Sequence, residues 1–309
     1  MIFNKDNKGC QELRELTGNY YASNEFNKML GFIHLATDEL SDLIGSDVYK
    51  EADKLYQDGA TEEKNKEFIR KVQQPIAIMA TLRMYQRNDL SHEDDGRKFK
   101  IDPENEKLPW QWQLDRDDEM HLEDYYTAVD SLIRYLNASD NEKWKESPAY
   151  KQSQLMLIQS GKEFEEYFPI QKSERSFLLL LPFMKEVQFK YTKKSYGTGR
   201  WDELLALKSN PESEVYFAAC KATALLTMAM ALRRMQLSII PSGVIRKYVI
   251  ENGSMSSKPA TIREVKQIAD WMEEDGKQWL NEMKIARDGG SIEYKLLPDN
   301  DKRNKYCRL

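Results

Sequence analysis

The sequence predicts a mainly α-helical protein of two tandem helical-bundle domains, with short β-strands in equivalent loops and extended terminal arms. Three observations lead to this fold class. The 309 residues include only 10 Pro and 14 Gly, whereas Leu, Met, Ala, Glu and Lys are frequent, a composition that favours helices. Apolar residues recur at spacings of three and four in several segments. The chain also matches itself at a distance of about 150 residues, a common domain size.

The internal match consists of three blocks of residues. The number of residues between matched positions differs by one or two from block to block. These differences arise within polar stretches, where changes of length are tolerated. The matched sets are Phe26, Leu30 and Phe32 with Phe177, Leu181 and Phe183; Gly45, Tyr49 and Leu55 with Gly197, Trp201 and Leu207; and Leu82, Arg83 and Gln86 with Leu232, Arg233 and Gln236. The repeat predicts a first domain over 1–139, a second over 140–289 and an extended tail over 290–309.

The helices of the first copy are predicted from an apolar stripe and from end signals. Between Phe26 and Ile44, apolar residues and Thr37 follow one another at spacings of three and four, and Gly45 can end this helix. We expect helices at 26–44, 47–57 and 61–87, a polar loop over 91–113 that holds a strand at Arg97–Ile101, and a closing helix through Leu122–Leu136.

The second copy predicts the same order of elements. Between the copies, the amphipathic stretch 141–168 ends before Pro169 and is expected to form the leading helix of the second domain. The elements expected after it are helices at 173–194, 201–208 and 212–237, a strand at Val244–Ile250, and a helix at 261–286.

Composition favours a cytoplasmic, globular chain. Its three cysteines are scattered and odd in number, which favours a reducing compartment, and its start lacks the basic and apolar runs of a secretion signal. Residues 215–232 are apolar apart from Lys221, but they are rich in Ala, so we expect a buried core helix and no membrane partner. The formal net charge of -5 gives no general attraction to nucleic acid or anionic membranes.

The acidic stretch 114–124 contains the strongest candidate for a metal site. In a helix, Asp117 and Asp118 would lie four and three residues before His121, a spacing that lets side chains share one metal. Carboxylates also gather at helix N-termini because the dipole favours them there, and we prefer this interpretation. His34 is expected to be half-buried, and the His92–Gly96 cluster to be a solvated turn. We therefore predict no metal ligands.

Catalytic motifs are not found in the sequence. G-x-S-x-G, GxxxxGK[ST] and GxGxxG are absent, and Gly197-Thr198-Gly199 is better explained as a break between two helices. Cys220 falls in the most apolar segment and is expected to be an inert core residue. We predict no catalytic residue, no cofactor and no enzyme activity.

Candidate binding residues are basic or aromatic. Basic residues with a nearby tyrosine could follow a phosphate backbone, although short basic runs are ordinary in a chain with 46 Lys and Arg. Trp110 and Trp112 lie in the predicted loop, where they could anchor a protein interface or fold back over the first core. The basic candidates are Arg233 and Arg234, the run Arg246–Tyr248, and the run Lys302–Arg308.

The repeated unit resembles the small helical head–tail connector, or adaptor, proteins of tailed bacteriophages. In that family a helix like 26–44 runs into a short segment like 44–49, and a long helix, a loop with extended backbone and a closing helix follow. The first copy matches over roughly 23–138, and the second more loosely over 173–286. The stretch LPWQWQLDRDD also resembles proteins of phages and prophages of Bacteroides-type bacteria.

This resemblance implies a structural virion protein. Its copies would form a homo-oligomeric ring under the portal, joining capsid to tail and lying close to the DNA in the channel, after assembly in the host cytoplasm. Family members act by geometry, so no catalytic residue is carried over. Exposed strand edges pair readily with other chains, so we expect subunit contacts at the two strands and the terminal arms. The alternatives are a bacterial helical adaptor or regulator that binds a protein, and a metal-dependent enzyme built on Asp117, Asp118 and His121.

Overall fold

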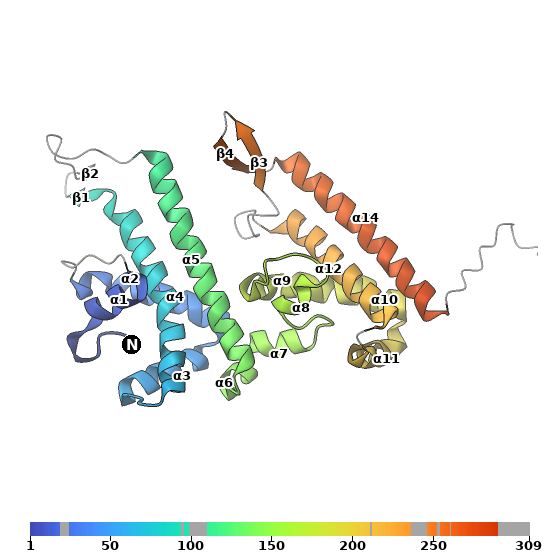
Figure 1. The fold of residues 1–309 in the computed structure, drawn as a ribbon, viewed down its shortest axis with the longest axis horizontal. Helices are drawn as coiled ribbons and strands as arrows, with labels where there is room; N and C mark the ends of the chain where they lie inside the picture. Colours follow the sequence, from blue (N-terminus) through green and yellow to red (C-terminus); the bar gives the residue numbers. More distant parts are fainter. Residues whose placement is uncertain are drawn as a thin grey trace, which may run out of the picture. The chain divides into compact units, whose positions relative to one another are not determined.

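The protein is mainly α-helical. A computed structural model describes residues 1–18, 25–93, 96–98, 110–210, 212–235, 246–251, 254–259 and 261–289. Its contacts divide the chain into two compact units (Figure 1), which are Met1–Glu165 with Ile170–Leu181, and Glu166–Pro169 with Pro182–Leu309.

The first unit is built around α4, against which α2 and α5 both lie (Figure 1). The stripe of α2 is buried as predicted apart from Leu30, which is partly buried, and Ile33, Leu40 and Ile44 are 0% exposed. Gln73 of α4 donates to the backbone oxygen of Ile2 at 2.6 Å and so holds the start of the chain on the core. The helices are η1 (Lys5–Asn7), α1 (Gly9–Thr17), α2 (Phe26–Ile44), α3 (Ser46–Asp58), α4 (Glu63–Asn88) and α5 (Gln111–Ala138).

Residues 141–168, predicted as one leading helix of the second domain, form three short helices, and most of them lie in the first unit. The prediction of a single helix is wrong because the stretch contains its own helix starts: Asn141 caps one and Ser147 caps the next. Trp144 is 1% exposed and belongs to the core of the first unit. The predicted boundary after residue 139 therefore falls inside this unit. The helices are α6 (Glu142–Glu146), α7 (Pro148–Gln154) and α8 (Gly161–Glu165).

The start of α9 (Glu174–Val187) is also tied to the first unit. The buried carboxylate of Asp130 on α5 accepts hydrogen bonds from the Ser173 hydroxyl at 3.1 Å and from the Arg175 backbone N–H at 2.7 Å. The Arg175 guanidinium lies 3.7 Å from the ring centre of Tyr126. These contacts explain why the units divide within α9 and not before α6.

In the second unit, α12 and α14 lie side by side (Figure 1). By length and composition α12 could cross a membrane, but 83% of its most apolar stretch is buried inside the fold, as predicted for a core helix. The remaining elements of this unit are a π-helical turn (Gln188–Thr192), α10 (Lys193–Tyr196), η3 (Thr198–Arg200), α11 (Trp201–Ala206), η4 (Leu207–Ser209), α12 (Glu214–Arg234) and α14 (Ile262–Arg287).

Each long helix is followed by an antiparallel strand pair before the closing helix. In the first unit β1 (Ser91–Glu93) pairs with β2 (Gly96–Lys98), and in the second β3 (Arg246–Glu251) pairs with β4 (Ser254–Pro259). Residues 99–101 and 244–245 of the two predicted strands lie outside the described residues, as does the tail 290–309.

Gly45 and Gly197 have similar backbone geometry at the ends of two helices. Gly45 has φ 96° and ψ 133°, and Gly197 has φ 121° and ψ 117°. Each donates its N–H to the carbonyl four residues earlier, at 2.8 Å and 3.1 Å respectively. Glycine is required because these positive φ values strain other L-residues.

Candidate interaction surface

The first half of α5 lies at the edge of the core and keeps most of its side chains exposed. None of the residues from Trp110 to Asp124, here called the α5 arm, is buried, and the first buried side chain is Tyr125. The loop predicted to reach residue 113 is therefore too long. Gln113 explains the earlier helix start, because its side-chain oxygen accepts the Trp110 backbone N–H at 2.9 Å.

Large apolar side chains are exposed on this arm. Trp110 is 71% exposed, Trp112 60% and Met120 56%. The alternative in which both tryptophans fold back over the first core is therefore wrong. Exposed Trp and Met side chains gain from burial against a partner and are enriched at protein interfaces.

The α5 arm is also strongly acidic. It carries six carboxylates against one arginine, Arg116. Asp118 on the arm affects Asp89, at the C-terminal end of α4. The pKa of Asp89 is raised by burial and, second, by the negative charge of Asp118. A positively charged partner surface would relieve this repulsion.

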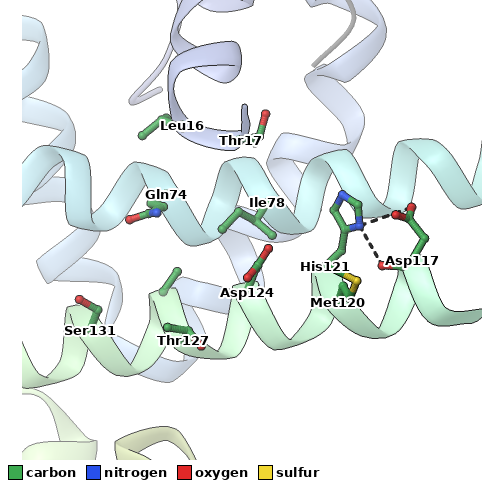
Figure 2. Close-up of a pocket in the computed structure, with 11 residues that line it drawn as sticks. Leu16, Thr17, Gln74, Ile78, Asp117, Met120, His121, Asp124, Thr127 and Ser131 are labelled. Atoms are coloured by element: carbon green, nitrogen blue, oxygen red, sulfur yellow. Dashed lines mark hydrogen bonds and ion pairs between the residues drawn. The ribbon is translucent and has the colours of Figure 1, made fainter. Parts of the chain in front are cut away.

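The candidate metal ligands lie on this arm but do not converge. His121 Nδ1 is 2.9 Å from the backbone oxygen of Asp117 and 3.5 Å from its carboxylate (Figure 2). Asp118 instead accepts a hydrogen bond from Gln86 of α4 at 2.9 Å. The His121 ring meets Tyr85 edge-on at 5.6 Å. No group of three potential ligands occurs among the described residues.

A cavity of about 410 Å³ lies beside these residues. Figure 2 shows Gln74 and Ile78 of α4 across from Asp124 of α5, with Leu16 and Thr17 of α1 above them. Its lining mixes hydroxyl, amide, carboxylate and apolar groups. This arrangement offers hydrogen bonds to a polar ligand, and among the described residues that line it no nucleophile is paired with a base.

The basic candidates on α12 are engaged in ion pairs. Arg233 donates to Asp270 and Glu273 of α14, and Arg234 donates to Glu186 of α9. These carboxylates occupy the guanidinium groups that would otherwise meet phosphate. Arg246–Tyr248 lies in β3, whose side chains are outside the described residues, as is the run Lys302–Arg308.

Among the remaining candidates, one prediction is confirmed by the structure and one is wrong. Cys220 is 0% exposed, as predicted for a core residue. His34 is exposed and not half-buried, because it lies off the stripe of α2. The side chains of the His92–Gly96 cluster are outside the described residues.

Two features of the structure were missed in the sequence. Glu174 is 3% exposed, and its carboxylate accepts hydrogen bonds from the backbone N–H groups of Gly161 and Lys162 at the start of α8. Phe217 and Trp279 meet edge-on at 5.6 Å between α12 and α14. Neither has a local signal, because the partners are 12 or more residues apart along the chain.

Fold and surface together define a mainly helical protein with an exposed, acidic and aromatic helical arm. The chain belongs to the Family of unknown function (DUF6712), whose model matches residues 40–154 and 185–285. No curated protein and no solved structure matches the chain.

Proposed function

We propose that the chain is a structural virion protein, a head-to-tail connector whose copies form a ring between the portal and the tail of a phage. The observation that carries this proposal is the repeated order of elements: a helix ended by a positive-φ glycine, a short helix, a long helix, a strand pair and a closing helix. This order is the one expected from the resemblance to connector proteins.

The same observation supports an internal duplication. The two family-matched segments, 40–154 and 185–285, each include the glycine junction, the long helix and the closing helix. Gly45 and Gly197 adopt similar dihedral angles at matching points. The two copies are proposed to be one tandem fold whose surfaces have diverged in use.

The α5 arm is the proposed contact with the portal or tail protein. Its tryptophans supply apolar area that a partner can bury, and its carboxylates select a basic partner surface. Subunits would join through different patches on each copy, because such head-to-tail contacts close into a ring when the rotation permits.

Replacing both arm tryptophans tests the partner contact. In the double variant W110A/W112A, affinity for the portal protein of the same phage is expected to fall at least about tenfold, since buried interface tryptophans commonly contribute more than about 2 kcal/mol. Binding would be measured by interferometry on full-length proteins. The matched control is L35A, because Leu35 is 56% exposed on α2.

Three results would contradict the proposal. One is unchanged portal binding by W110A/W112A. Another is the absence of portal and tail genes beside the gene for this chain. A stable monomer or dimer that binds another class of protein would favour a bacterial helical adaptor instead.

A further inference from the structure

The second unit has a groove between the start of α12 and the end of α14. Its volume is about 490 Å³, enough for one or two long side chains of a bound peptide. The residues that matter for its chemistry are Glu212, Glu214, Phe217, Trp279, Glu282 and Ala286.

One wall of the groove is aromatic. Phe217 is 43% exposed, and its ring centre lies 5.6 Å from that of Trp279 and 5.6 Å from that of Tyr167. The faces of such rings carry partial negative charge and attract ammonium and guanidinium groups.

The groove also has three carboxylates that form no ion pair with any residue the structure describes. Glu212, Glu214 and Glu282 have no cationic partner among the residues that the structure describes. By contrast, Glu273 of the same unit forms ion pairs with Arg233 and Lys277. Glu212 and Glu214 more than offset the partial positive charge at the start of α12. Carboxylates beside aromatic rings are suited to a lysine or arginine side chain.

The most basic stretch of the chain has the matching chemistry. Residues 302–308 read KRNKYCR, with four cations and no acid. They follow the groove in sequence: Ala286 lines it on the last turn of α14, and residues 290–301 separate the segment from Gly289, the last residue described. Twelve residues can span at most about 40 Å, more than the diameter of a small domain.

We infer that this groove binds the basic segment Lys302–Arg308 of a second copy of the chain. The inference rests on the ring proposed above. Each copy has one groove and one basic segment, so the contact repeats from copy to copy and can close. Cation–π contacts with Phe217 and Trp279 and ion pairs with the three glutamates hold the segment.

Isotope-mixed crosslinking identifies the occupant of the groove. Unlabelled and ¹⁵N-labelled full-length protein are mixed, allowed to assemble, and treated with a carbodiimide that couples carboxylates directly to lysines. We expect Glu212, Glu214 or Glu282 to be coupled to Lys302 or Lys305 in peptides of mixed isotope. Coupling only between peptides of the same isotope would mean that the groove holds its own segment, and no coupling would mean that it holds neither; both overturn the inference.

Charge reversal separates this inference from the proposed function. The variant E212K/E214K/E282K is expected to raise the concentration needed for ring assembly at least tenfold, and K302E/R303E/K305E/R308E in the same chain should restore it. The control is E274K, an exposed position on α14 outside the groove. If the wild-type chain forms rings that the groove variant forms equally well, the inference alone fails. If the wild-type chain forms no oligomer and binds no portal protein, both fail.

Discussion

At the scale of single residues, two buried carboxylates hold the last part of the first unit in place. Asp130 binds the residues that begin α9, and Glu174 binds the start of α8. Burial, the larger effect, raises the pKa of Glu174, although the two backbone N–H groups oppose it. Sequence alone could not reveal these roles, since an acidic residue has no local mark that it will be buried.

The raised pKa of Glu174 predicts how stability changes with pH. The folded state binds the proton of the Glu174 carboxyl more tightly than the unfolded state does. The stability that this proton contributes is therefore fully present below the ordinary pKa of 4.5, and it is lost as pH rises through the pKa of the folded state. Relative to E174Q, the wild-type chain should therefore gain unfolding free energy as pH falls from 7 toward 4.5. Urea unfolding at a series of pH values measures this difference, and a flat or opposite trend would contradict the assignment.

At the scale of elements, the apolar stripes predicted the main helices well. Residues 26–44 form α2 as expected, and the long apolar stretch forms the core helix α12. The errors lie where a side chain starts a helix: Gln113 extends α5 backward, and Ser147 starts a new helix inside the next stretch. A helix starts where a side chain forms a capping hydrogen bond. Several residues in one polar segment can form such a bond, so the sequence does not show which of them starts the helix.

The contact of α12 with α14 requires a glycine. A Cβ at Gly276 would lie 2.7 Å from Leu226 Cγ, whereas a Cβ at Gly31 of α2 would meet nothing within 4 Å. Overpacking costs about 1–3 kcal/mol, which exceeds the gain of up to about 1 kcal/mol from replacing glycine in a helix. We expect G276A to lower the unfolding free energy by about 1 kcal/mol or more, and the control G31A to raise it by about 0.5–1 kcal/mol. Equal effects of both variants in denaturant unfolding would exclude this packing.

At the scale of the whole molecule, the structure is mainly helical, and its contacts divide it into two units later in the chain than the predicted boundary after residue 139. The repeat marks where elements recur, whereas the units reflect which elements pack together. Helices α6 to α8 and the start of α9 pack on the first unit through Trp144, Asp130 and Arg175, and a pattern of spacings does not record such long-range contacts.

The proposed ring also belongs to this scale, and the mass of the assembled chain tests it most directly. Full-length protein would be measured alone and with its portal protein by light scattering, with images from electron microscopy. We predict a closed oligomer whose mass is a large whole-number multiple of 36.3 kDa. A species of 36.3 kDa that stays monomeric in the presence of the portal protein would contradict the account.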